Sequence, residues 1–289
     1  MFLISKGKKV NKSVFIFLSP AFVLLIFVGI FPFVFNLYLS FSLLKPGTIV
    51  SSGFAGVSNF VSALIDNDFL NSLRITMVYT VGCVGIETIL GVGLALLLNR
   101  HIKGKSVIRT LLLLPVMIAP AVSAYIFLYL YNPIYGVVSY YLRLNRSILG
   151  SSDLALLGIM AVDVWQWTPF IMLVTLSALQ GVPEAPFEAA IVDGASSWQI
   201  IRYITLPLIW PIVLIGVLIR IIDAYKVFAY VTIMTEGGPS STTRLLSYHA
   251  YDIMFTNLQW GKGAALSLII LFTIIVICTV YMKLLKVKI

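Results

Sequence analysis

Long apolar blocks constrain this chain more than any other feature of its sequence. Residues 263–282 are twenty consecutive residues without a charged side chain. At a rise of about 1.5 Å per residue, a helix of that length spans about 30 Å, which is the thickness of the hydrocarbon core of a bilayer. Similar blocks cover residues 14–42, 73–98, 108–131, 155–179 and 208–233. The pattern predicts an all-α membrane protein with six transmembrane helices, because a helix satisfies its own backbone hydrogen bonds in lipid.

The lysines and arginines are distributed unevenly around these blocks. Twelve fall on the side that would hold both chain ends, and six fall on the other side. Most of the twelve cluster at residues 6–12, 100–109 and 283–288. Cytoplasmic segments of membrane proteins carry such a basic excess, so we expect both termini to lie in the cytoplasm. The net charge of +9 then follows from topology, and we expect membrane lipid rather than nucleic acid as a partner.

Patterns typical of catalysis or metal binding do not stand out in the sequence. Residues 103–106 read KGKS, the last letters of a phosphate-binding loop, but Asn99 occupies the position of the first glycine of that motif. His101 and His249 fall on opposite sides of the membrane, which argues against a histidine metal site within one chain. The titratable groups are too scattered for an enzyme, so we expect no catalytic residue, metal or cofactor in this chain.

A polar segment at residues 181–207 interrupts the apolar blocks on the cytoplasmic side. Pro183 and Pro186 suit the start of a helix, where the missing N–H would be unpaired in any case. Asp193 and Gly194 then predict the end of that helix, because glycine readily adopts a positive φ. Helical spacing would place three apolar side chains on one face, those of Phe187, Ala190 and Ile191.

A second short helix is expected directly after this break. Ser196 and Gln199 have the spacing of a capping box, in which each side chain bonds the backbone N–H of the other residue. We expect this helix to end at or before Pro207, where the next apolar block begins. The predicted product is a pair of helices joined at a glycine, with an apolar face that no lipid covers. Such a face suits the groove of a cytoplasmic partner.

The same segment carries the pattern E-A-A, two further residues, D-G-A, and then I-T-L-P. This pattern resembles the EAA loop of permease subunits of binding-protein-dependent ABC importers. The matching residues are Glu188, Ala189, Ala190, Asp193, Gly194, Ala195, Ile204, Thr205, Leu206, Pro207 and Pro211. The resemblance implies the type I importer permease fold and a loop that docks in a cleft on a separate ATPase subunit. It assigns this coupling to the first six of these residues, Glu188 to Ala190 and Asp193 to Ala195.

Other stretches are similar to the carbohydrate-uptake branch of that family, the maltose and glycerol-phosphate permease type. They include VDVWQWTPF at residues 162–170 and T-x-G-G-P at residues 235–239. The chain departs from many relatives at Ala229, where aspartate is frequent, and at Lys262, which replaces a glycine. The resemblance implies a second permease, two ATPase subunits that bind ATP and Mg, and an extracytoplasmic sugar-binding protein. It also implies import of a di- or oligosaccharide across the cytoplasmic (inner) membrane of a prokaryote.

Five charged residues fall inside the predicted spans: Glu87, Asp163, Arg220, Asp223 and Lys226. A charge at the centre of a lone membrane helix costs about 2.5–3.5 kcal/mol, so these side chains should face the bundle interior or water. Arg220, Asp223 and Lys226 are spaced by three residues, so Asp223 can pair with either base. Glu87 has no obvious partner in the sequence, and we expect it to pack against the second permease.

Two interpretations of these charges and their aromatic neighbours stay open. In one, they are ion pairs and packing residues that stabilise the bundle. In the other, they line a translocation path in which aromatic rings cover the apolar faces of sugars. The candidate path residues are Asp163, Trp165, Trp167, Arg220, Asp223, Tyr225, Lys226 and Phe228.

The sequence divides into two parts. Residues 1–70 would hold an N-terminal cytoplasmic segment, the first span and an external loop, and residues 71–289 would form a five-helix permease core. Two other functions stay open. The chain could be a permease of the same family for another solute such as glycerol phosphate. It could also be a self-contained secondary carrier that uses the charges of the fifth span as an ion relay.

Overall fold

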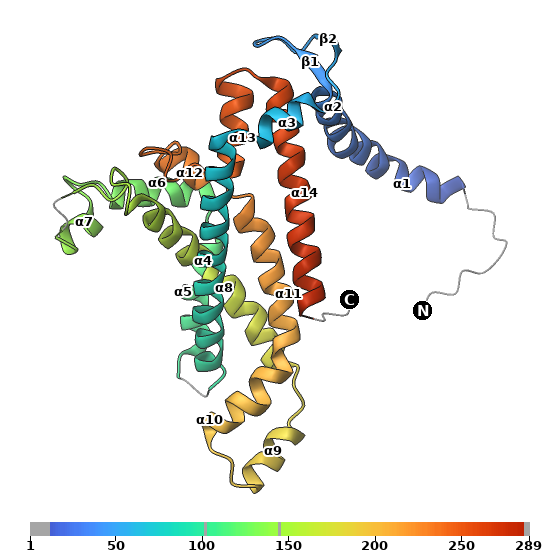
Figure 1. Cartoon of the computed structure of the whole chain (residues 1–289). Coiled ribbons are helices and arrows are strands. Elements are labelled where there is room, and N and C mark those ends of the chain that lie inside the picture. The colour runs from blue at the N-terminus through green and yellow to red at the C-terminus, as the bar shows by residue number, and fades with distance from the viewer. Residues whose placement is uncertain (1–11, 101–102, 144–145, 286–289) are drawn as a thin grey trace. The chain divides into compact units, whose positions relative to one another are not determined.

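The computed structural model describes residues 12–100, 103–143 and 146–285 (Figure 1). The prediction of a mainly helical chain is confirmed, with one two-stranded hairpin in addition. His101 and several of the basic residues behind the topology prediction lie outside the described residues. They are Lys6, Lys8, Lys9, Lys286 and Lys288.

Five helical segments of the described chain are long and apolar enough to cross a membrane. They are Ile16–Ser40, Asn67–Leu98, Ala155–Gln180, Ser197–Met234 and Trp260–Leu284. A sixth crossing arises if α5 (Lys105–Met117) and α6 (Pro120–Leu130) are counted as one span, although they are bent by 97° at the break between them.

The apolar block at 108–131 is therefore two helices rather than the one expected. Ile118 and Ala119 are extended, with ψ of 136° and 138°. A residue that precedes a proline is disfavoured in the α conformation, which explains why the chain leaves the helix before Pro120. Pro120 then begins α6, where its missing N–H removes no helical hydrogen bond.

The chain folds as two compact units, one of residues up to 63 with 252–268 and one of residues 64–251 with 269 onward. The first contains α1 (Lys12–Leu24), η1 (Leu25–Ile30), α2 (Phe31–Ser40), β1 (Ser42–Leu44), β2 (Ser51–Phe54), most of α3 (Ser58–Leu64) and η3 (Asp252–Thr256). The strands pair antiparallel, and Asn59 Nδ2 secures them by donating to the carbonyls of Ser40 and Ser42 at 2.9 and 3.0 Å. In the most apolar window of Ile16–Ser40, no residue is buried within the chain.

The second unit is built around α4 (Asn67–Leu98) and α8 (Ala155–Gln180), which share the most extensive helix contact of the described chain. Gly91 allows this close approach, because a Cβ at that position would lie 2.7 Å from Ile171 Cβ. The unit also contains α5, α6, α7 (Val137–Tyr141), α9 (Ala185–Val192), α10 (Ser197–Ile200), η2 (Ile201–Thr205), α11 (Leu206–Tyr225), α12 (Ala229–Met234) and α13 (Leu246–Tyr251). The last long helix, α14 (Trp260–Leu284), begins in the first unit and ends in the second.

The chain stays helical through Pro207, so the predicted helix end at this proline is wrong. α10, η2 and α11 follow one another without interruption. A proline inside a helix loses one hydrogen bond, and its ring presses on the carbonyl four residues earlier. The wider π-helical turn η2 lies directly before Pro207 and makes room for the ring. The break in this apolar block comes later, at residues 226–228, between α11 and α12.

Candidate functional site

The predicted helix–glycine–helix segment forms as a compact bend, which we call the elbow: α9, α10 and the turn between them. Gly194 has a φ of +75°, as predicted, directly after α9. The capping box is also confirmed, because Ser196 Oγ accepts from the Gln199 N–H at 3.3 Å and Gln199 Oε1 accepts from the Ser196 N–H at 2.7 Å. The turn is therefore held by its own residues.

The six residues assigned to ATPase coupling lie together on the elbow. Glu188, Ala189, Asp193 and Gly194 are exposed, Ala195 is half-buried and Ala190 is buried. The predicted apolar face is only partly right, because its members point to different surroundings. Phe187 lines a cavity of about 630 Å³ behind the elbow, together with residues of α4 and α8 such as Leu96 and Leu179.

Large apolar side chains are exposed on the elbow and on η2, which follows it. Four of them, which we call the outer face, are Ile191 (66%), Val192 (87%), Trp198 (66%) and Tyr203 (69%). Neighbouring large apolar side chains are rarely left uncovered on a soluble surface, and they mark contact sites. The elbow thus presents a surface that a partner can bury.

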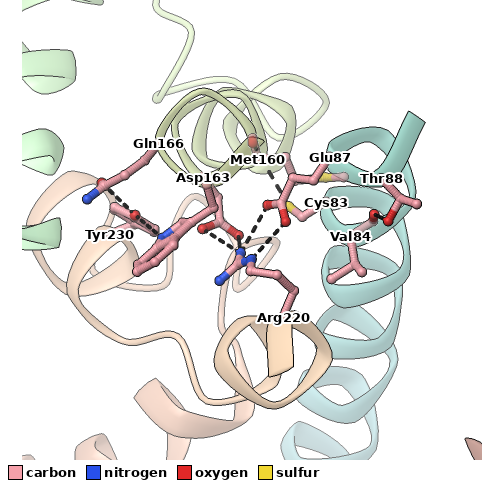
Figure 2. A network of polar contacts seen from close by, with 10 residues as sticks. Cys83, Val84, Glu87, Thr88, Met160, Asp163, Gln166, Arg220 and Tyr230 are labelled. Carbon is pink, nitrogen blue, oxygen red and sulfur yellow. Dashed lines mark hydrogen bonds and ion pairs between the residues drawn. The ribbon is translucent and has the colours of Figure 1, made fainter. Parts of the chain in front are cut away.

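Three charged side chains from three helices meet in the interior of the second unit (Figure 2). We call Glu87, Asp163 and Arg220 the charge triad. Arg220 Nε donates to Glu87 Oε2 at 2.8 Å and Nη2 donates to Glu87 Oε1 at 3.0 Å, while Nη2 also lies 3.2 Å from both carboxylate oxygens of Asp163. All three side chains are no more than 1% exposed. Such a buried, bidentate arrangement joins α4, α8 and α11.

A cation–π contact and three hydrogen bonds between uncharged groups connect the triad to the bend between α5 and α6. The guanidinium of Arg220 lies 4.8 Å from the centre of the Trp167 ring, and Trp167 Nε1 donates to Tyr230 Oη at 3.2 Å. Tyr230 donates to Gln166 Oε1 at 2.8 Å (Figure 2). Gln166 Nε2 in turn donates to the carbonyl of Ile118 at 2.6 Å. Gln166 of α8 therefore satisfies the carbonyl of Ile118, which is freed where the chain leaves the helix between α5 and α6.

The structure corrects one expectation about the charges and decides between two alternatives for another. The sequence predicts that Glu87 packs against a second permease, but it forms the bidentate pair with Arg220 within the chain. Asp223 pairs with Lys226, with 3.1 Å between Oδ1 and Nζ, because Arg220 is already engaged by two carboxylates. The Glu87–Arg220 pair could have been predicted from the sequence, because opposite charges in separate membrane spans usually pair with one another.

A cavity of about 250 Å³ lies beside the triad, at the break between α11 and α12. Six of the eight candidate path residues line it: Asp163, Trp167, Arg220, Asp223, Lys226 and Phe228. Pro120 and Tyr230, which the sequence did not single out, line it as well. The cavity thus combines aromatic rings with charged groups that are paired to one another. Among the described residues, no cluster of His, Cys, Asp and Glu could hold a metal ion.

The other two candidates, Trp165 and Tyr225, are not among the residues that line this cavity. Trp165 packs edge-on against Phe127, with 5.1 Å between ring centroids. Tyr225 is fully buried, and its hydroxyl lies 2.8 Å from Thr273 Oγ1 of α14. Both contacts are packing contacts between helices.

Replacing Tyr225 by phenylalanine tests this packing role. We expect the loss of one buried hydrogen bond to lower the stability of the folded chain by about 1 kcal/mol. Thermal unfolding of the purified protein would measure the loss, with Phe228→Leu as a comparison variant in the cavity wall. A Tyr225→Phe variant as stable as the unmodified chain would contradict the assignment.

Residues 87–287 match the sequence profile of the family described as binding-protein-dependent transport system inner membrane component. The trehalose/maltose transport system permease protein MalF of Thermococcus litoralis is 35% identical over 239 residues, covering 80% of this chain and 79% of the relative. The sn-glycerol-3-phosphate transport system permease protein UgpA of Agrobacterium fabrum is 33% identical over 234 residues, covering 78% of each.

A chain of known structure is similar over nearly its full length. It comes from the crystal structure of a bacterial alginate ABC transporter in complex with alginate pentasaccharide-bound periplasmic protein. The TM-score is 0.82 at 20% identity, and 96% of each chain is covered. At this identity, the likeness describes the fold alone.

Proposed function

Because the chain belongs to the family of binding-protein-dependent transport system inner membrane components, we propose that it is a permease subunit of an ATP-driven sugar importer. The observation that carries the proposal is the family match together with the exposed elbow, which places the matching motif where another protein can reach it. In this proposal, the bent pair of α5 and α6 counts as one span of the subunit. The subunit would have six transmembrane helices and both termini in the cytoplasm of a prokaryote, and would lie in the inner membrane.

A second, similar permease completes the path in this proposal. The support is the segment Ile16–Ser40, which is apolar along its length and has no buried residue in its most apolar window. Membrane helices gain stability by packing against other helices, so a segment with so little of its apolar surface buried offers that surface to another subunit. The two permeases together would enclose the translocation path.

Two ATPase subunits would dock on the elbows, one on each permease. The outer face supplies apolar surface for the contact, and exposed Glu188 and Asp193 add polar groups around it. ATP and Mg would be bound by those ATPases and not by this chain, which itself performs no hydrolysis. Closure of the ATPases would move the elbow. The movement would pass through η2 to α11, which carries Arg220.

The proposed cargo is a di- or oligosaccharide that an extracytoplasmic binding protein delivers. The relative from Thermococcus litoralis is named for trehalose and maltose, which supports a sugar. The cavity at the helix break would be part of the path, because Trp167 and Phe228 offer rings to the apolar faces of a sugar. Glycerol phosphate is the alternative cargo, supported by the name of the relative from Agrobacterium fabrum.

Purification of the assembled complex tests the proposal. The chain would be produced with its partner permease, its ATPases and its binding protein, and reconstituted into liposomes. We expect ATP hydrolysis to rise when the binding protein is supplied with maltose or trehalose, and the sugar to accumulate in the lumen. Uptake by this chain alone, driven by an ion gradient and without ATPases, would overturn the proposal.

A further inference from the structure

The charge triad also bears on which cargo can enter the cavity. Resting on the proposed function, we propose that the triad makes this cavity selective for uncharged sugars and excludes sugars that carry a negative charge. The relatives named above transport cargo of both kinds, neutral disaccharides and glycerol phosphate, so membership of the family leaves the charge of the cargo open. The side chains around the cavity decide it.

The first step is the charge balance of the buried groups. Arg220 is the only base in the charge triad, and its Nε and Nη2 atoms are already bonded to two carboxylates. With both carboxylates ionised the triad carries one net negative charge, and with one of them protonated it is neutral. In neither state does positive charge remain to attract an anion.

The second step is the remaining charged lining. Asp223 and Lys226 pair at 3.1 Å, with side chains 34% and 61% exposed, so this pair contributes no net charge. The lining therefore offers no uncompensated cation to a carboxylate or phosphate. An anion that enters would lose hydration without gaining a free cation, which makes its binding unfavourable. With both carboxylates ionised it would also face the net negative charge of the triad.

A neutral sugar finds better partners in the same cavity. Among the hydrogen bonds of the described residues, none is donated by Arg220 Nη1, so its two N–H groups can serve a sugar hydroxyl. Phe228 presents a ring, and Asp223 presents a carboxylate that can accept from a hydroxyl. The volume of about 250 Å³ is below the range of about 300–1,000 Å³ typical of ligand pockets, which suits one sugar ring at a time.

A matched pair of probes measures this selectivity directly. 4-Nitrophenyl glucoside and 4-nitrophenyl glucuronide differ only in the carboxylate that replaces the C6 hydroxymethyl group. Their affinities would be measured by equilibrium dialysis on the assembled permease–ATPase complex without binding protein, so that selectivity of the binding protein does not enter. We expect the glucoside to bind the unmodified complex about tenfold or more tightly than the glucuronide, from the repulsion of one unit charge at close range.

Two variants shift the charge of the cavity in opposite directions. Asp163→Asn keeps the bidentate Glu87–Arg220 pair and removes the negative charge that the triad carries when both carboxylates are ionised. The ratio of glucuronide to glucoside affinity should therefore rise, by up to about tenfold. Lys226→Glu acts at a largely exposed position that folding tolerates, and the ratio should fall further below that of the unmodified complex. Asp153→Asn, at the exposed pair with Arg146, makes the same charge change elsewhere and should leave the ratio unchanged.

The outcomes separate this inference from the import function. If both variants and the Asp153→Asn control give the same ratio, or if the glucuronide binds the unmodified complex as well as the glucoside, the triad does not select cargo by charge. If neither probe binds, the cavity is not a sugar site. ATP-dependent uptake of maltose or trehalose in liposomes would still stand in each of these cases, because it is measured separately. Failure of that uptake would instead overturn the proposed function.

Discussion

Replacement of Arg220 by methionine is expected to destabilise the folded chain by about 3–5 kcal/mol. The substitution keeps most of the side-chain volume but leaves the carboxylates of Glu87 and Asp163 buried, adjacent and without a counter-charge. Removing one partner of a buried ion pair typically has an effect of this size, because the remaining charge has lost water and gained nothing in return. Thermal unfolding of the purified protein in detergent, together with the yield of inserted chain, would measure the loss.

Two companion variants decide whether the cause is uncompensated charge. The triple variant Glu87→Gln, Asp163→Asn and Arg220→Met removes all three charges, so most of the lost stability should return. Arg146→Met breaks an exposed pair, whose side chains are 57% and 60% exposed, and should change stability by less than about 1 kcal/mol. An Arg220→Met variant no less stable than Arg146→Met would show that the triad does not hold α4, α8 and α11 together.

The second large effect is expected at the elbow. Glu188→Lys reverses a charge at the exposed first residue of the motif. Gly194→Trp adds a bulky ring at a turn whose φ of +75° strains any L-residue with a side chain. We expect both variants to lose the ATPase from the purified complex, a decrease of at least about tenfold in co-purified ATPase, while the spans still insert.

Controls at the elbow separate its shape from its backbone strain. No atom lies within 4 Å of a Cβ built at Gly194, so Gly194→Ala tests the strained φ without new bulk. Asp153→Lys reverses an exposed charge outside the elbow and should leave the ATPase bound. Co-purification of the ATPase with Glu188→Lys and Gly194→Trp at the level of the unmodified chain would rule out docking at the elbow.

The parts of the fold that could be predicted from the sequence are those set by neighbouring residues. The positive φ of Gly194 and the capping box of Ser196 and Gln199 depend on side chains at most three residues apart. The Asp223–Lys226 pair also obeys this spacing, and choosing it over Arg220 required knowledge of the other helices.

The charge triad could not be predicted from rules about neighbouring residues. Glu87 and Arg220 are 133 residues apart, and Arg220 and Asp163 are 57 apart. No periodicity within one helix can indicate which faces of α4, α8 and α11 meet, because packing between helices fixes that. The predictions of two helix boundaries were wrong for a related reason. The chain leaves the helix before Pro120, whereas a π-helical turn keeps it helical through Pro207.

The hydrogen bond from Gln166 to the carbonyl of Ile118 has a mechanical consequence. A shift of α5 or α6 along α8 would break this bond and leave the carbonyl of Ile118 without its partner, at a cost of about 1–3 kcal/mol. Gln166 therefore anchors the break between α5 and α6 to one level of α8.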